Sequence, residues 1–531
     1  MSGNGLINGA VERALPPKWQ WSCVGDIALG IDYGHTASAK DTPIGPRFLR
    51  ITDITPQGVD WGAVPGCEID AGDIERCRLR RDDLLFARIG SVGKSFLIRD
   101  CPEAVFASYL IRVKLAEGFE PRFVFAYFQS TEYWSQITEV QQGIGRPVVN
   151  GTKLAALRVP IAPPAEQARI VDRIDELFTD LAAGVAALER VKRNLSRYRA
   201  AVLHAAVTGR LTEAWRKQHG LPEELGPKLL ERILIERRRQ WEHRTLAKYE
   251  KAGKQPPKYW RDRYPEPSPP KLSTDGTESA LPDLPPTWYW ASLDQISDVT
   301  GGVAKNQKEA GRPGMRDVPY LRVANVQRGY LDLSEIKTIS ASEEDIEELA
   351  LRPGDVLFTE GGDRDKLGRG WLWEGQIPEC IHQNHIFRAR PFLADLRTVL
   401  LSHAGNSYGQ IWFRSNGIQS VNLASINLCV LRQFPVPIAP VAEQAAIVEA
   451  VNEKISQIDA LEAKVERGLA RAGRLRQAIL KAAFEGRLVP QDPNDDPASV
   501  LLERIRTEAA STDSKPARKT RKKSSRKAAA T

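Results

Sequence analysis

One stretch of this chain occurs twice, and the duplication constrains the fold more than any other feature of the sequence. Residues 159–211 begin VPIAPPAEQARIV and end TGRL, and residues 436–488 begin VPIAPVAEQAAIV and end EGRL. The two stretches align without a gap and are identical at about half of their positions. A gapless match of this length indicates an internal duplication, so we expect two copies of one structural unit.

Both copies have the apolar spacing of a coiled coil, with steps that alternate between four and three residues. Proline before the first turn and glutamate within it favour a helix start. Gly209 and Gly486 are expected to adopt the left-handed conformation that ends a helix. We therefore predict long helices over 164–211 and 441–488. The predicted seam residues are Ile170, Ile174, Leu177, Leu181 and Leu188 in the first helix, and Ile447, Val451, Ile458, Leu461 and Val465 in the second.

Two seams in one chain favour helices that pair with each other. The alternative is two surface helices, each packed on its own domain. Heptad spacing over more than three repeats favours the coiled coil. Gly184, Gly468 and Lys454 occupy seam positions, and packing should be looser there.

The duplication extends beyond the helices. LPPKWQW at 15–21 returns as LPPTWYW at 284–290, and LRRDDLLFARIGSVGK from Leu79 matches LRPGDVLFTEGGDRDK from Leu351. The second pair indicates a buried strand followed by a glycine-rich loop. Further predicted elements are strands around Leu49, Ile111, Leu321 and Phe387, an amphipathic helix from Phe123 and its looser partner from Thr398. Strands and helices mix without strict alternation, which is typical of an α+β fold.

The predicted layout repeats one order of domain, long helix and following segment. LLERI at 229–233 returns at 501–505, so even the segments after the long helices are partly duplicated. The expected parts are a flexible N-terminus (1–14), a first α+β domain (15–163), the first long helix (164–211), a basic helix with a proline-rich, extended linker (212–283), a second α+β domain (284–440), the second long helix (441–488) and a C-terminal segment with a disordered basic tail (489–531).

The net charge of +8 does not by itself indicate a DNA-binding protein. The segment from Lys515 to Lys527 contains eight Lys or Arg residues and no acidic residue. Their eight positive charges equal the entire net charge of the chain. This tail either attracts phosphates non-specifically or only increases solubility. No run of eighteen apolar residues exists, so no membrane span is expected. Six scattered cysteines without a CxxC pair are typical of reduced thiols in a cytoplasmic protein.

No motif predicts catalysis or a cofactor in this chain. RIGSVGKS resembles a phosphate-binding loop, but Arg88 stands where the first glycine is required. A tight glycine turn, or a loop that faces DNA, is the better interpretation. Cys380, His382 and His385 have metal-like spacing, but on a strand the two histidines would point to opposite faces, so we predict no metal. The chain also lacks an Asn/Asp/Ser-Pro-Pro-Tyr/Phe methyltransferase motif and a recognisable nuclease cluster.

Two α+β domains, each followed by PIAP-x-AEQ and a long helix ending in GRL, resemble the specificity subunit of Type I restriction–modification enzymes. The resemblance runs from Leu15 to about Leu502, while the basic linker after Leu211 and the Lys/Arg tail depart from it. It implies two target-recognition domains, each reading one half of a split, asymmetric DNA sequence. It also implies that the two helices pair antiparallel as a pseudo-two-fold repeat and set the spacer between the half-sites.

The resemblance further implies a set of partners. These are double-stranded DNA, two modification subunits that bind S-adenosylmethionine and methylate adenine, and restriction subunits that act as a motor and nuclease with ATP and Mg²⁺. The chain itself would supply specificity and no catalytic residue. The alternative is a coiled-coil scaffold with two protein-binding domains and no DNA role, which steeply salt-dependent DNA binding would exclude.

Polar residues near the predicted loops are candidates for DNA contact. Contacts to phosphates would position each domain, and contacts to base edges would specify the sequence. The candidates are Arg88, Lys94, Arg146, Arg364, Lys366, Arg369, Arg414 and Asn416. The alternative for each is an ordinary solvated surface role.

Overall fold

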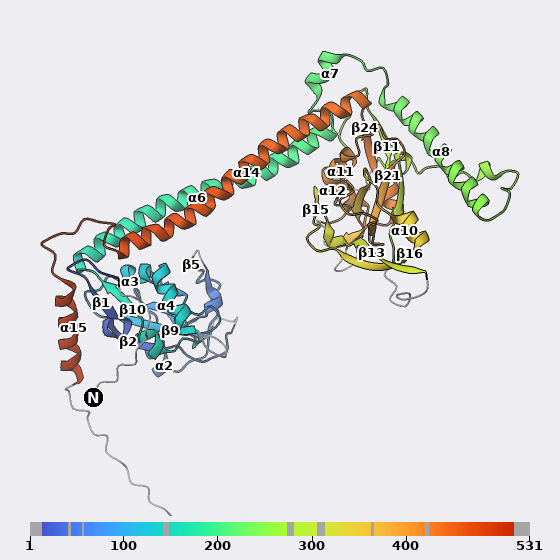
Figure 1. Ribbon diagram of the computed structural model, residues 1–531. Coiled ribbons are helices and arrows are strands. Elements are labelled where there is room, and N and C mark those ends of the chain that lie inside the picture. The colour runs from blue at the N-terminus through green and yellow to red at the C-terminus, as the bar shows by residue number, and fades with distance from the viewer. Residues whose placement is uncertain are drawn as a thin grey trace, which may run out of the picture. The chain divides into compact units, whose positions relative to one another are not determined.

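The computed structural model describes residues 13–513 except 41–43, 56–57, 142–147, 273–280, 305–313, 363–365 and 420–423. The chain forms two compact units, Met1–Glu189 with Glu466–Thr531, and Arg190–Val465. The long helices α6 (Pro164–Val207) and α14 (Val441–Phe484) each contribute to both units (Figure 1). Each unit therefore holds one α+β domain and a part of each long helix.

The first unit is organised around a four-stranded antiparallel sheet in the order β2-β9-β6-β7. A short pair, β1 with β10, joins the start of the domain to its end. The strands are β1 (Gln20–Cys23), β2 (Ala28–Tyr33), β3 (Arg47–Leu49), β4 (Ile54–Thr55), β5 (Gly58–Val59), β6 (Leu84–Ala87), β7 (Ser95–Leu97), β8 (Ala104–Phe106), β9 (Leu110–Leu115) and β10 (Arg158–Ile161). The helices besides α6 and α14 are α1 (Val24–Ile27), α2 (Ala71–Cys77), α3 (Pro121–Tyr127), α4 (Thr131–Gln141), α5 (Gly151–Ala155) and α15 (Ala498–Asp513).

The second unit repeats this arrangement. Its main sheet has the order β12-β21-β17-β19, and β11 pairs with β24 as β1 does with β10. The strands are β11 (Tyr289–Ser292), β12 (Ser297–Gly301), β13 (Met315–Leu321), β14 (Val326–Gln327), β15 (Tyr330–Leu331), β16 (Lys337–Ser342), β17 (Val356–Thr359), β18 (Gly361–Gly362), β19 (Gly370–Leu372), β20 (Ile381–His382), β21 (Ile386–Pro391), β22 (Ile418–Gln419), β23 (Ala424–Ser425) and β24 (Pro435–Ile438). The additional helices are α7 (Glu213–His219), α8 (Gly226–Lys251), α9 (Leu293–Ile296), α10 (Glu343–Leu349), α11 (Val399–Asn406), α12 (Gly409–Asn416) and α13 (Leu428–Arg432).

The central strand of each sheet divides the core of its unit in two. Because side chains alternate along a strand, Leu84 and Phe86 of β6 pack with the helices, whereas Leu85 packs on the opposite side against the region of β3 and β8. In β17, Phe358 likewise packs in the core that contains the helices, whereas Leu357 packs in a separate core on the opposite face of the sheet. The apolar run common to both copies is therefore a strand buried on both faces.

The long helices pack antiparallel in both units, where Figure 1 shows them side by side. In the first unit Ile174 shares a core with Ile479, and Leu188 lies against Gly468. In the second unit Ala206 shares a core with Ile447. Residue numbers fall along α14 as they rise along α6, so the helices run in opposite directions. Together these features form the α+β fold with a paired-helix internal repeat.

The seam is narrower than the heptad pattern predicts. Ile170, Ile447 and Ile458 are almost fully buried. Leu461 is 46% exposed, so its placement in the seam is wrong. Val451, Ile458 and Val465 follow each other at steps of seven and stay buried, so the contact line follows this position of the heptad and Leu461 lies beside it. Among the remaining predicted seam residues, Ile174, Val451 and Val465 are buried and Leu177, Leu181 and Leu188 are half-buried.

The helix predicted from Phe123 is in fact two helices. α3 ends at Tyr127, and the Ser130 hydroxyl accepts a hydrogen bond from the Tyr133 amide at 3.2 Å near the start of α4. A serine that satisfies a free amide in this way favours a new helix start. The predicted partner helix from Thr398 is likewise divided, into α11 and α12.

Candidate DNA-recognition surface

Three repeated motifs meet at one junction in each unit. In the first unit, Trp19 of LPPKW donates a hydrogen bond from Nε1 to Glu166 of AEQ at 2.9 Å. Gly486 of GRL has φ of 67°, as predicted for a helix end, and a side chain on it would collide with Pro16. The beginning of the domain is therefore joined both to the start of α6 and to the end of α14.

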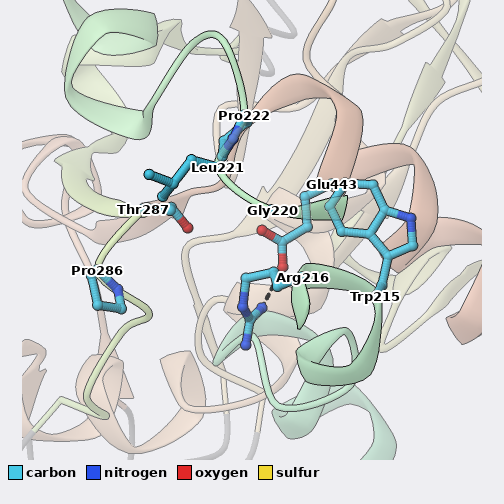
Figure 2. Close-up of a pocket in the computed structure, with 8 residues that line it drawn as sticks. All are labelled: Trp215, Arg216, Gly220, Leu221, Pro222, Pro286, Thr287 and Glu443. Atoms are coloured by element: carbon cyan, nitrogen blue, oxygen red, sulfur yellow. Dashed lines mark hydrogen bonds and ion pairs between the residues drawn. The ribbon is translucent and has the colours of Figure 1, made fainter. Parts of the chain in front are cut away.

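The same junction forms in the second unit. Trp288 Nε1 donates to Glu443 at 2.8 Å, and Gly209, with φ of 73°, lies against Pro285. Glu443 also pairs with Arg216, as Figure 2 shows. A cavity of about 350 Å³ lies beside this pair, but the buried carboxylate already has its partners.

The glutamine of each AEQ motif fixes the adjoining turn. Gln167 accepts from the Glu120 amide at 3.0 Å and donates to the Ala162 carbonyl at 2.8 Å. Gln444 makes the equivalent bonds to Arg397 and Ala439 at 2.9 and 2.8 Å. The motif is thus structural, and it places each α+β domain on the helices.

Equivalent strand ends in the two domains carry side chains of opposite charge. The Arg88 amide, just after β6, donates to the Tyr109 carbonyl at 3.0 Å. The Glu360 amide, just after β17, donates to the His385 carbonyl at 3.0 Å. The backbone therefore pairs Arg88 with Tyr109 in one domain and Glu360 with His385 in the other.

The first domain presents a cation and aromatic rings at this position. The Arg88 guanidinium lies 4.9 Å from the centre of the Tyr33 ring. Its buried Nε has no hydrogen-bond partner in the described part of the chain. Tyr109 is 57% exposed. Lys94, at the other end of the same glycine turn, is exposed and lines a groove of about 850 Å³ that also contains Trp134.

The second domain presents an acid and a histidine instead. Glu360 Oε2 lies 2.5 Å from His385 Nδ1, and both line a cavity of about 370 Å³ with Gly361 and Gly362. A carboxylate can accept hydrogen bonds from base amino groups, whereas an arginine can only donate. The same scaffold position can therefore read different base edges in the two domains.

The remaining predicted contacts fall in several places. Lys366 lies beside Gly362, and Arg369 donates to the Val323 carbonyl at 3.2 Å, so both belong to the glycine-loop region. Arg414 is exposed on α12. Asn416 Nδ2 donates to the Trp412 carbonyl one turn earlier at 2.9 Å, so this contact is within its own helix. Arg146 and Arg364 lie outside the described residues.

Sequence reasoning missed Tyr109, Glu360 and His385 as recognition candidates. The alignment of the two copies already places Glu360 opposite Arg88, and this is the signal that could have found it. The pairing with His385 depends on the register of β17 with β21.

The histidines near β20 do not meet at a metal site. His382 is buried, and its Nδ1 lies 2.9 Å from the Ile386 carbonyl, whereas His385 is exposed beside Glu360. Within the described ranges, no group of three or more His, Cys, Asp or Glu side chains could hold a metal ion. In the same ranges, no helix has the length and apolar character needed to cross a membrane.

Comparison with known proteins agrees with this arrangement. Residues 48–190 match the family described as Type I restriction modification DNA specificity domain. The chain is 26% identical to the EcoKI specificity subunit of Escherichia coli (strain K12) over 459 residues, covering 82% of this chain and 81% of that protein. It is 23% identical to the StySPI specificity subunit of Salmonella potsdam over 430 residues, which cover 79% of this chain and 78% of that protein.

A solved structure shares the fold. A chain from a study of the assembly and conformational transition of the type I restriction–modification system aligns with a TM-score of 0.55 and 18% identity, covering 90% of this chain and 100% of that one. These comparisons show that the chain is similar to the specificity subunits of Type I restriction–modification enzymes over most of its length.

Proposed function

We propose that this chain binds a two-part, asymmetric DNA sequence and directs adenine methylation and restriction by a Type I complex to it. One observation carries the proposal, namely that equivalent positions on two copies of one scaffold hold Arg88 and Glu360. Two copies with unlike contact residues are suited to two unlike half-sites. Arginine pairs well with the O6 and N7 acceptors of guanine, and glutamate accepts from the amino group of cytosine.

The proposal assigns all chemistry to partner subunits. Two modification subunits would bring S-adenosylmethionine, and restriction subunits would bring ATP and Mg²⁺. The duplication supports two modification subunits, because the chain presents two copies of one arrangement of domain and long helices. Such a complex would act on DNA in the cytoplasm. The scaffold alternative is disfavoured, because the relatives are specificity subunits.

Methylation mapping with single-residue variants tests the proposal. The chain would be co-expressed with its modification subunits in a host without other adenine methylation, and methylated sites would be sequenced. We expect one bipartite motif for the wild type. Arg88→Gln should relax only the first domain's half-site and Glu360→Gln only the second's, because one good base contact contributes about 1–3 kcal/mol of discrimination.

A matched control separates base reading from general charge. Arg81 is exposed, with 74% of its side chain accessible, and lies on the same chain segment as Arg88. Arg81→Gln should leave both half-sites unchanged. An undivided motif for the wild type, or a loss of preference in both half-sites for either variant, would contradict the proposal.

A further inference from the structure

A strongly basic segment of the second unit lies outside the candidate recognition surface. Residues 237–263, here named the basic arm, contain ten Lys or Arg residues and only three Asp or Glu residues. The arm comprises the C-terminal part of α8 and a returning segment that ends in a 3-10 turn, Trp260–Arg263.

The arm is attached firmly to the second domain. Leu229, Leu230 and Ile233, on the preceding turns of α8, are buried in the core of that domain. Gly226 begins the helix, and a side chain there would lie 2.6 Å from the Ile438 carbonyl oxygen. α8 can therefore start directly against β11 and β24, and Figure 1 shows it running along this domain.

The arm is a folded hairpin and differs from the extended linker that its prolines predict. Trp241 of α8 stacks on Trp260 of the returning segment, with ring centres 5.6 Å apart. Arg237 donates to the Tyr264 hydroxyl at 2.5 Å and to the Pro265 carbonyl at 2.8 Å. These contacts hold the returning segment against the helix, so the cations of both are presented together.

Several cations of the arm are exposed and available. Lys248, Lys251, Lys254 and Arg263 are exposed and have no acidic partner in the described part of the chain. Arg244, Lys248 and Lys251 follow at steps of four and three, which places them on one face of α8, where Arg244 also pairs with Asp298 at 3.2 Å. At ~1.5 Å per residue they lie roughly 6 and 4.5 Å apart along the helix axis, forming a row of positive charge.

We propose that the basic arm binds the sugar-phosphate backbone of duplex DNA beside the half-site read by the second domain. This inference rests on the proposed function. Duplex DNA presents a continuous line of negative charge, and Lys and Arg are the usual donors to its phosphates. The arm holds the DNA without reading its sequence, and it adds affinity to the base contacts of the second domain.

The composition of the arm favours DNA over an acidic protein partner. Lysine is depleted in protein–protein interfaces, which instead need an apolar core. The exposed large apolar side chains within the arm are Leu246 and Tyr259, and the Lys258 ammonium lies 5.4 Å from the Tyr259 ring centre. A row of lysines with so little apolar surface suits phosphates better.

The salt dependence of DNA binding by the full chain tests the inference. The probe is a random-sequence 40-base-pair duplex carrying a fluorophore, so base reading contributes little. A variant with Lys248, Lys251, Lys254 and Arg263 all changed to Gln is compared with the wild type. Each lost phosphate contact should reduce the slope of log K against log salt by ~0.9, so four lost contacts reduce it by up to ~3.6. Both proteins retain the basic tail, so its contribution cancels.

Two controls define the result. A charge-conserving variant (K248R, K251R, K254R and R263K) should keep the wild-type slope. Changing four exposed cations of α14 to Gln, namely Lys464, Arg467, Arg471 and Arg474, should reduce the slope less than the arm variant does.

The possible failures can be told apart. An unchanged slope for a folded arm variant, or an equal reduction for the α14 variant, would overturn the arm proposal and leave the proposed function intact. An unchanged slope together with lost assembly with modification subunits would assign the arm to a protein contact. Absence of salt-dependent DNA binding by the wild type would instead overturn the proposed function.

Discussion

Trp19 donates a hydrogen bond from its indole nitrogen to the carboxylate of Glu166 at 2.9 Å, and the two residues are only 6% and 1% exposed. They are separated by 147 positions in the sequence and belong to different repeated motifs. Trp288 and Glu443 form the equivalent bond, so both copies use the two motifs for the same contact. Burial raises the pKa of Glu166, and the bond from Trp19 opposes this rise by stabilising the charged form.

Removing the indole donor of Trp288 should destabilise the second unit, because the equivalent bond of the first unit is made by Trp19. Trp288→Phe retains most of the buried ring but removes a donor to a buried carboxylate, which should cost about 1.5–3 kcal/mol of unfolding free energy. The matched control is Trp290→Phe in the same motif, because Trp290 is half-buried and packs edge-on against Tyr408 without being this donor. Urea unfolding followed by circular dichroism measures both. Equal losses for the two variants would contradict a role for the hydrogen bond.

A fragment that ends after α8 should dimerise. In the whole chain, Phe484 of α14 is 1% exposed and its ring lies 5.2 Å from that of Phe123, so a fragment without α14 exposes this surface. Val207 is the equivalent of Phe484 in the repeat, and a second copy of the fragment can supply it. We expect residues 1–251 to form a dimer by light scattering. A stable monomer would contradict the pairing.

A shorter fragment, residues 1–211, should form a weaker dimer. α15 packs Leu501 and Leu502 against the first domain, and the matching Leu229 and Leu230 belong to α8. The longer fragment carries this LLERI segment and the shorter one lacks it. Sedimentation at several concentrations compares the two dissociation constants, and equal values would show that the segment is not exchanged.

The buried Arg112 should be essential for the stability of the first domain. It is 1% exposed, and it pairs with Asp32 at 2.7 Å and with Asp83 at 3.4 Å. Burial raises the pKa of Asp83, and Arg112 opposes this rise. Arg112→Met leaves a buried carboxylate without its cation, which should cost about 3–5 kcal/mol in urea unfolding. Adding Asp83→Asn should recover part of the loss, and no recovery would show that packing rather than charge is responsible.

The second unit should lose stability in mild acid. Burial lowers the pKa of His382 and of His403 to about 4, from an ordinary value of 6.5. The unfolded chain takes up protons below pH 6.5, while the folded chain does so only near pH 4. Stability is therefore lost as pH falls through 6.5 towards 4, by about 2 kcal/mol per histidine between pH 7 and pH 5.

Replacing these histidines should remove that pH dependence. The difference in unfolding free energy between pH 7 and pH 5 should shrink for His382→Asn and for His403→Asn. The exposed His243 provides the control, and His243→Asn should keep the wild-type difference. A wild-type-like difference in the two buried variants would show that other groups carry the acid sensitivity.

Local signals in the sequence determined much of the fold. The repeated helix starts at Pro164 and Val441, and the glycines at 209 and 486, were predicted because a helix start and end depend on neighbouring residues. The buried strands β6 and β17 were predicted for the same reason, since their apolar runs end in glycine-rich turns. The resemblance to Type I specificity subunits was also evident in the repeated motifs and their order.

The tertiary structure alone decided which distant residues meet. The exposure of Leu461 depends on how α6 lies against α14. The apolar spacing within α14 alone does not contain this information. The pairing of Glu360 with His385 needs the register of β17 with β21. The hairpin of the basic arm needs Trp241 to reach Trp260 across a turn whose prolines favour an extended chain locally. Hydrogen bonds and ring contacts of this kind join segments that only the packed chain brings together, so they determine which polar side chains lie together at the candidate recognition surface.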